Sequence, residues 1–235
     1  MTIQITRMRE EDIDGAIDTI QQAFAEDPYN NWVFDRSTFS TILNRVSLGI
    51  RCRWGLQHAL FYVAKDASSS TPDKVIGTAT WLPPSPPSAP RSWPLYLASW
   101  SLWLQQVRMN LYYGRGGLNT KRYWIWKAAQ HEAQSGLWTD ERGYYFCNIV
   151  TVLPECQGRG IGRALFEVVM GRADEEGVNC YLESSRAEPN MRIYERMGFK
   201  LARDMLCDDN GDAIKLFCMM REPKRRESNM QPRRG

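Results

Sequence analysis

The stretch YYFCNIVTVLPECQGRGIGR, residues 144–163, decides the fold. Its first ten residues are almost continuously apolar or aromatic, with Asn148 as the one polar residue of note, which is typical of a strand buried on both faces. Three glycines follow at positions 158, 160 and 162 and lead into a helix that starts at Ile161. A strand, a glycine-rich turn and a helix in this order predict an α/β domain.

The glycine loop predicts a binding site for phosphate oxygens. Its glycines let the backbone come close to a ligand. The first amides of the following helix have no internal partners, and they lie at the positive end of the helix dipole. A pyrophosphate fits such a site. Arg159 and Arg163 would either add charge-assisted contacts or be merely solvated, and a tight turn without a ligand is the alternative for the whole loop.

Other phosphate-binding motifs are absent or incomplete. The P-loop pattern GxxxxGK[ST] does not occur. A dinucleotide fold needs GxGxxG after an early strand, whereas the chain has GxGxG near residue 160. Glu183, at the end of the next expected strand, stands at the distance of a ribose-binding acid, so a dinucleotide site stays open as a minor alternative.

Periodicity predicts the elements on both sides of this loop. Before the loop we expect a strand at 2–8 and a helix at 13–24. A second helix is expected to begin at its N-cap Ser37 and to reach Ile50. Strands at 60–65 and 74–82 follow, and the turn 66–73 joins them. Asp27-Pro28 ends the first helix. After the loop we expect a helix to Gly177, a strand at 178–182, a short helix at 189–196 and a hairpin of strands at 199–206 and 213–220. These elements predict a mixed, mostly antiparallel sheet of about seven strands flanked by helices.

Residues 83–143 are expected to form an insertion after the third strand. Residues 83–94 hold six of the twelve prolines and predict a stiff connector. Two helices follow, one with apolar positions from Leu97 to Leu111 and one at 120–134. The dense apolar stretch from Leu95 to Leu104 predicts a core helix. The aromatic residues at 123, 124 and 126 would line a substrate pocket or, as is commoner, pack against the sheet.

Length and composition predict one domain, residues 1–222, followed by a basic, disordered tail at 223–235. The chain has 235 residues, and no apolar run reaches the ~18 residues of a membrane helix. Because no signal peptide is recognisable, we expect a cytoplasmic protein without membrane contact.

The net charge of +3 comes from the tail, so nucleic acid is not an expected partner. Six cysteines without CxxC spacing predict buried thiols and no metal site.

Two motifs give the chain a family resemblance. VLP at 152–154, followed by QGRGIG at 157–162, resembles the acetyl-CoA signature (R/Q)xxGx(G/A) of the GNAT acetyltransferases. Asn190 and the segment YERMGF at 194–199 are similar to the helix-to-strand segment that follows this signature in the family. With LESS at 182–185, they look most like the puromycin N-acetyltransferase type. The first 143 residues resemble the family only in the order of their elements.

The resemblance implies a GNAT fold that binds acetyl-CoA. The glycine loop would hold the pyrophosphate, and the strand end at 150–152 would part from its neighbour, so that main-chain groups bind the pantetheine arm and the acetyl carbonyl. An N–H aimed at that carbonyl would stabilise the oxyanion. The expected cofactor-binding residues are Val150, Thr151, Val152, Gln157, Gly158, Arg159, Gly160, Ile161, Gly162, Arg163, Ser185 and Asn190.

Tyr194 is expected to be the general acid that protonates the leaving CoA thiolate. Its reference pKa of ~10 is close to that of an alkyl thiol. Asn190, four residues earlier, would share one helix face with it. A core tyrosine is the alternative. The general base stays open among water, Asp27, His131 and Glu132.

For the acceptor site we expect Asp27, Trp32, Phe34 and Tyr145, because a carboxylate beside aromatic faces suits an amine. The neutral body of the chain favours a small molecule as acceptor. The expected function is therefore acetyl transfer from acetyl-CoA to a primary amine. A protein or peptide N-acetyltransferase and a non-catalytic CoA-binding module are the alternatives.

Overall fold

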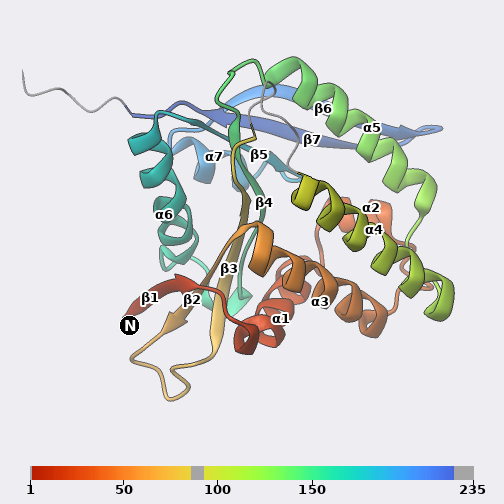
Figure 1. Ribbon diagram of the computed structural model, residues 1–235, viewed down its shortest axis with the longest axis horizontal. Helices are drawn as coiled ribbons and strands as arrows, with labels where there is room; N and C mark the ends of the chain where they lie inside the picture. Colours follow the sequence, from red (N-terminus) through yellow and green to blue (C-terminus); the bar gives the residue numbers. More distant parts are fainter. Residues whose placement is uncertain (1, 86–92, 225–235) are drawn as a thin grey trace, which may run out of the picture.

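The computed structural model describes residues 2–85 and 93–224, which fold around a seven-stranded sheet (Figure 1). The strands are β1 (Ile3–Arg7), β2 (Leu60–Asp66), β3 (Val75–Leu82), β4 (Tyr144–Val152), β5 (Asn179–Ser184), β6 (Lys200–Asp209) and β7 (Asp212–Arg221). Their order across the sheet is β1-β2-β3-β4-β5-β7-β6. Neighbours run antiparallel except for β4 and β5, which are parallel. The mixed, mostly antiparallel sheet expected from the sequence is confirmed.

Helices cover both faces of this sheet. They are α1 (Ile13–Ala23), α2 (Pro28–Val33), α3 (Thr41–His58), α4 (Trp93–Tyr113), α5 (Thr120–Leu137), α6 (Ile161–Glu176) and α7 (Asn190–Glu195), with short 3-10 turns η1 (Glu10–Asp12) and η2 (Pro154–Cys156). On one face, α6 packs across strands β1 to β5. On the opposite face, α1 packs on β3 and β4, and α5 packs on β6. Figure 1 shows α6 on the left of the sheet and α1, α3 and α5 on the right.

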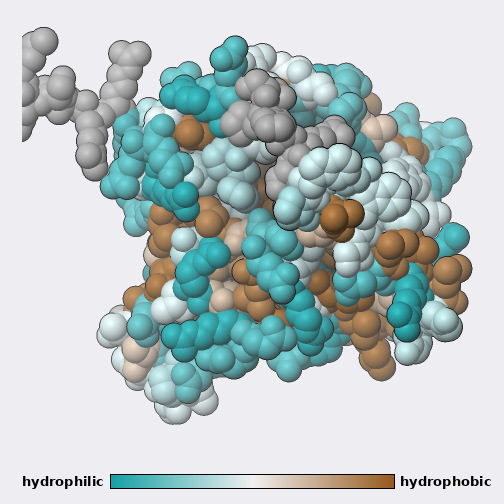
Figure 2. All heavy atoms as spheres, in the orientation of Figure 1, coloured by the Kyte–Doolittle hydropathy of each residue, from teal (hydrophilic) through white to brown (hydrophobic). Residues whose placement is uncertain are grey.

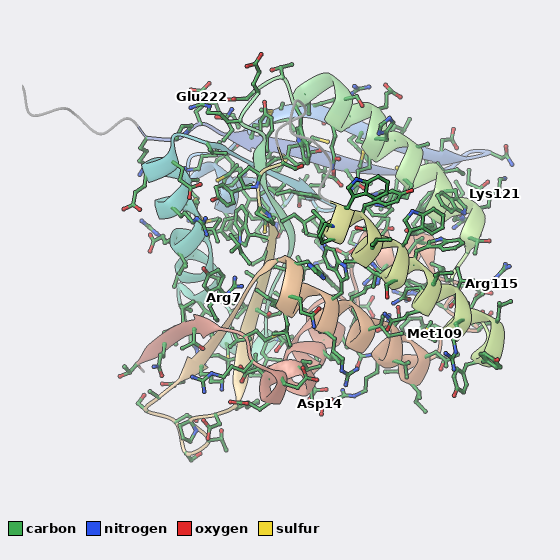
Figure 3. All side chains as sticks on the ribbon, viewed as in Figure 1. Arg7, Asp14, Met109, Arg115, Lys121 and Glu222 are labelled. Atoms are coloured by element: carbon green, nitrogen blue, oxygen red, sulfur yellow. The ribbon has the colours of Figure 1, made fainter. Side chains whose placement is uncertain are left out.

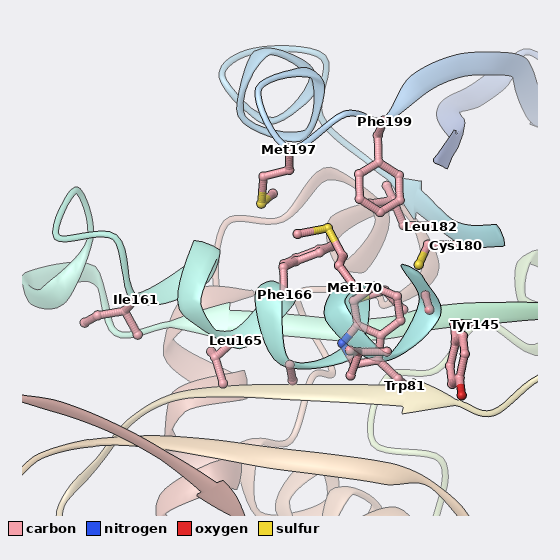
Figure 4. Close-up of a cluster of buried hydrophobic side chains, with 14 of the residues drawn as sticks. Trp81, Tyr145, Ile161, Leu165, Phe166, Met170, Cys180, Leu182, Met197 and Phe199 are labelled. Carbon is pink, nitrogen blue, oxygen red and sulfur yellow. The ribbon is translucent and has the colours of Figure 1, made fainter. Parts of the chain in front are cut away.

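The largest core lies between the sheet and α6. This helix buries residues three or four positions apart, which places them on one face; they are Ile161, Leu165, Phe166, Val169, Met170 and Ala173. Figure 4 shows Phe166 of α6 close to Trp81 of β3, and their rings meet edge to face with centroids 5.1 Å apart. This packing fixes the start of α6 against the end of β4, where the glycine loop lies.

Two helix starts differ from the sequence-based expectation. Ser37 was expected to cap α3, but its hydroxyl donates to Asp35 instead. Ser40 is the cap, because its hydroxyl accepts from the N–H of Leu43 at 3.3 Å. Asp27-Pro28 was expected only to end a helix. It also starts α2, since the Asp27 carboxylate accepts from two α2 amides and Pro28 occupies the first helical position.

The expectation of a core helix at 95–104 is wrong. That stretch belongs to α4, in which only Met109 is buried. The helix packs mainly on α3, and a polar pair joins them, with the Ser47 hydroxyl donating to Gln106 Oε1 at 2.8 Å. The sequence has apolar residues on every side of α4, whereas α3 covers one side only. The opposite side faces solvent.

Further expectations about the chain have mixed outcomes. All six cysteines are buried and free, as expected. Residues 86–92, in the proline-rich connector, and 225–235, in the basic tail, lie outside the described residues. Within residues 2–85 and 93–224, no cluster of side chains has the composition of a metal site. In the same ranges, no helix is both long and apolar enough to span a membrane.

Candidate active site

The parallel strands β4 and β5 part halfway along their length. Their pairing starts at Tyr144 with Asn179 and ends at Cys147 with Leu182, although β4 continues to Val152. At the same point β4 bulges against β3, because Ile149 pairs with Thr80 while Cys147 pairs with Trp81. Asn148 is the extra residue, and it is exposed in a strand that is otherwise buried up to that position. The splay expected at 150–152 is present.

The parting leaves one edge of β4 open to a ligand. The N–H of Leu153 donates to the carbonyl of Ile76 on β3 at 2.9 Å. Main-chain groups alternate between the two edges of an antiparallel strand, so those of Val150 and Val152 face the open edge. The carbonyl of Val152 accepts from Gln157 Nε2 at 3.2 Å, which ties the glycine loop to the end of the strand.

The glycine loop presents its backbone to solvent. Gly158 and Gly160 have φ of +74° and +79°, a region that side chains rarely adopt, and a Cβ at either position would meet no heavy atom within 4 Å. The loop residues 157–160 are exposed. The first intrahelical bond runs from Ala164 N–H to Gly160 O at 3.0 Å, so the amides just before it lack helical partners. This opening can accept phosphate oxygens.

The two loop arginines are held by the chain itself. The Arg159 guanidinium donates to the carbonyl of Glu155 at 3.0 Å. Arg163 forms an exposed ion pair with Glu167 one turn along α6, at 2.7 Å. Both residues are exposed.

Tyr194 lies on α7, beside the point where β4 and β5 part. Its ring packs against Phe166 and Phe199, with centroids 5.6 and 6.2 Å away. Burial, followed by the Cys147 thiol and the Asp27 carboxyl, raises the pKa of Tyr194 well above its ordinary value. Because Cys147 is the last β4 residue paired with β5, these neighbours bring the hydroxyl close to the splay. Burial therefore makes the phenol a weaker acid than the free side chain on which the sequence-based expectation rests.

The other residues expected near the cofactor anchor the end of β5. Asn190, at the start of α7, donates from Nδ2 to the Ser184 hydroxyl at 3.3 Å. The Ser185 hydroxyl donates to the second oxygen of Asp27, which also caps α2. Asp27 is buried, and its oxygens accept hydrogen bonds from within the chain. It therefore joins the α1–α2 loop to the strand end next to Tyr194.

The remaining residues expected at the acceptor site have structural contacts of their own. The Trp32 indole N–H donates to the carbonyl of Asp212 at 2.9 Å, and its side chain is buried. Phe34 packs edge to face on Phe39 with centroids 5.3 Å apart. The Tyr145 hydroxyl donates to Glu176, at the far end of α6 from the glycine loop. None of these three contacts involves the splay.

Glu183, which the sequence suggested only as the ribose-binding acid of a dinucleotide site, is a candidate acid–base residue in the structure. It follows Leu182, the last β5 residue paired with β4, and shares a strand face with Tyr181 two positions earlier. Its carboxylate accepts from Gln130 at 2.9 Å, Gln134 at 3.3 Å and the Tyr181 hydroxyl at 2.9 Å. Burial raises the pKa of Glu183. The sequence signal for Glu183 is its position as a carboxylate at the end of an otherwise apolar strand.

The two candidate bases on α5 lie on its solvent side. Glu132 is exposed and forms an ion pair with Arg203 on β6, and His131 is exposed beside it. The aromatic residues of α5 divide in the same way. Tyr123 and Trp126 pack in the core shared by α5, β6 and β7, whereas Trp124 is exposed.

Comparisons with known proteins agree with this geometry. Residues 119–201 match the model of the acetyltransferase (GNAT) domain. An uncharacterized N-acetyltransferase of Schizosaccharomyces pombe is 28% identical over 125 residues, which are 51% of this chain and 52% of that protein. The chain thus spans about half the length of this curated relative.

Two solved structures extend the likeness to nearly the whole chain. A structure described as histone acetyltransferase HPA2 and related acetyltransferase, from Corynebacterium glutamicum, has a TM-score of 0.64 at 17% identity and covers 97% of this chain and 99% of its own. NAA60 of Arabidopsis thaliana in complex with a bisubstrate analogue has a TM-score of 0.55 at 16% identity, with 95% and 99% covered. At these identities the likeness concerns the fold, and the puromycin N-acetyltransferase type is not specifically supported. The chain therefore shares the fold of these acetyltransferase structures, and residues 119–201 are similar to the GNAT domain.

Proposed function

We propose that this protein transfers the acetyl group of acetyl-CoA to the primary amine of a small molecule. The observation that carries the proposal is the parting of β4 and β5 next to Tyr194, with the open glycine loop at the end of the same strand. A thioester carrier with a diphosphate at one end and a reactive sulfur at the other matches this arrangement. The GNAT domain supports the same reaction class.

The cofactor would bind mainly to the backbone. The amides of residues 158–163 would hold the diphosphate, because they are open to solvent and lie at the positive end of α6. The pantetheine arm would pair with the main-chain groups of Val150 and Val152 along the open edge of β4. This pairing would place the thioester between the two strands, near Tyr194.

The reaction would proceed by direct attack of the amine on the thioester carbonyl carbon. A main-chain N–H of the open β4 edge would stabilise the negative oxygen as the C–N bond forms. The C–S bond then breaks, Tyr194 would donate its proton to the leaving sulfur, and the remaining excess proton of the attacking nitrogen would pass to the phenolate, directly or through water. The products are the N-acetylated amine and CoA. Since burial raises the pKa of Tyr194, the phenol is protonated throughout the neutral range.

The ammonium form of the acceptor must lose a proton before it attacks. We assign this proton to Glu183, because its carboxylate lies where the strands part and has a raised pKa. Neither Glu132 nor His131 has comparable burial. Asp27, whose oxygens accept bonds from α2 and Ser185, would hold the surrounding loop in place.

We propose a small molecule as the acceptor. The Glu183 carboxylate is held by Gln130 and Gln134 of α5 and the Tyr181 hydroxyl, which fixes its position for a proton transfer. A basic or acidic stripe that would guide a charged polypeptide is lacking in the sequence. A protein or peptide amine is the second candidate, and a protein that binds CoA without turnover is the third.

One assay separates these candidates. The protein is incubated with acetyl-CoA and one acceptor from aminoglycosides, aminonucleosides, polyamines, arylamines and peptides, and the release of free thiol is measured. Release with certain small amines supports the proposal. Release with peptides alone would favour the second candidate, and tight CoA binding without release on any acceptor would favour the third. Binding of NAD in preference to CoA would contradict all three.

A further inference from the structure

The outer face of α4 is apolar and has no protein partner among the described residues. Large apolar side chains recur on it at spacings of three, four and seven, which places them in one stripe along the helix. They are Trp93, Tyr96, Leu97, Trp100, Trp103, Leu104 and Leu111, all more than 40% exposed. We call these residues the α4 face.

Four aromatic rings form a ladder along the α4 face. The ring centroids of Trp93 and Tyr96 lie 6.0 Å apart, those of Tyr96 and Trp100 lie 6.2 Å apart, and those of Trp100 and Trp103 lie 5.4 Å apart. Figure 2, with α4 in front, shows apolar and pale residues interrupting the hydrophilic surface over this helix. An ordinary surface helix turns its apolar side inward, whereas α4 also exposes a continuous apolar stripe to solvent.

The side of α4 that faces the protein contributes one buried residue and a polar pair. Gln106 exchanges hydrogen bonds with Ser47 of α3, donating to its carbonyl at 3.1 Å and accepting from its hydroxyl at 2.8 Å. Met109, labelled in Figure 3, is the one fully buried residue of α4. The apolar content of α4 is therefore not explained by its packing within the described chain.

The charges near the α4 face are positive. Residues 93–131 contain no Asp or Glu. Arg108 is the one charged residue of α4, and its guanidinium lies 5.8 Å from the centroid of Tyr112, while Arg115 lies exposed just after the helix (Figure 3). Arg108 forms no ion pair with any described residue. Both cations lie toward the C-terminal end of the α4 face.

We propose that the α4 face binds the surface of a lipid bilayer that contains anionic lipids. Trp and Tyr rings favour the headgroup level of a membrane, and an interfacial helix buries one apolar face there while basic residues contact anionic headgroups. A second copy of the chain fits less well, because the same face repeated offers no acid to Arg108 or Arg115. The proposal replaces the sequence-based expectation of no membrane contact and is independent of the proposed acetyl transfer.

Vesicle flotation tests the proposal with a matched pair of variants. The full chain is mixed with phosphatidylcholine vesicles, alone or with roughly one quarter phosphatidylserine. The wild type is expected to float with the anionic vesicles, and Leu104→Glu with Leu111→Glu is expected to reduce the bound fraction at least about tenfold. Leu206→Glu is the control, since Leu206 is 62% exposed on β6 and Leu104 is 54% exposed on α4. This control is expected to bind like the wild type.

A second variant keeps the test decisive should the double substitution unfold the protein. Arg108→Gln leaves the apolar stripe intact and is expected to weaken binding to the anionic vesicles about fivefold, with the loss disappearing at high salt. Absence of wild-type binding to either vesicle would overturn the proposal, as would equal losses in Leu206→Glu. So would a dimer in vesicle-free solution, measured by light scattering, that Leu104→Glu with Leu111→Glu dissociates.

Discussion

In the proposed active site, the side for the cofactor and the side for the acceptor are built in different ways. The cofactor side consists of backbone from one continuous stretch, β4 through the start of α6. The acceptor side consists of side chains brought together over long distances in the sequence, as in the hydrogen bond from Gln130 to Glu183, 53 positions apart. Backbone geometry depends on local sequence, such as glycines and strand ends, whereas side-chain clusters depend on the packing of the whole domain. The first kind of site can be recognised from sequence and the second cannot.

The largest expected effect comes from closing the backbone site. Gly160→Val should raise the KM for acetyl-CoA roughly 100- to 1000-fold, because valine resists a φ of +79° and the amides facing the diphosphate would shift. Isothermal titration with CoA measures the loss. Gly171→Ala is the control, since a Cβ there meets no neighbour within 4 Å inside α6. It should leave CoA binding unchanged, and an equal loss there would argue against a backbone-built site.

The acceptor side is tested by Glu183→Gln, with an expected fall of about 100-fold in kcat/KM for the amine. The group must be deprotonated to accept a proton, so activity should fall as pH drops through its raised pKa. The variant should lose that dependence and retain only the titration of the amine. Glu132→Gln removes an exposed carboxylate and should change neither quantity. A Glu183→Gln enzyme with the wild-type pH profile would remove the assignment.

Tyr194 links the two sides, and its removal should affect turnover without affecting CoA binding. Tyr194→Phe is expected to lower kcat at least about tenfold, because the leaving sulfur loses its proton donor. Its raised pKa also means that wild-type activity should show no loss from this phenol below pH ~10. Tyr145→Phe is the matched control, since that hydroxyl bonds to Glu176 at the far end of α6. A wild-type rate in Tyr194→Phe would end the proposed role.

The smallest effect is expected at Asp27. Asp27→Ala should lower the free energy of unfolding by about 1 to 2 kcal/mol, because α2 loses its cap, while Asp27→Asn should cost less than about 0.5 kcal/mol. Urea unfolding measures both. The acceptor KM of Asp27→Asn should stay within about twofold of the wild type. A tenfold increase would instead make Asp27 a direct acceptor-binding residue.

The sequence predicted the strands, the sheet class and the glycine loop, because periodicity and glycine positions act locally. It did not predict α2, since Asp27-Pro28 can end one helix or begin another. It also predicted, wrongly, that α4 lies in the core. An apolar pattern indicates how much surface a helix can bury, but it does not indicate which neighbouring element covers that surface. The contacts of Glu183 with Gln130 and Gln134 required the packing of α5 next to β5, which no local pattern encodes.

A crystal structure with bound CoA tests the central claim most directly. We expect the diphosphate oxygens within hydrogen-bond distance of main-chain nitrogens among residues 158–163. We also expect the sulfur between β4 and β5, next to the Tyr194 hydroxyl. A diphosphate held elsewhere, or a sulfur outside the splay with that hydroxyl turned away, would contradict the account.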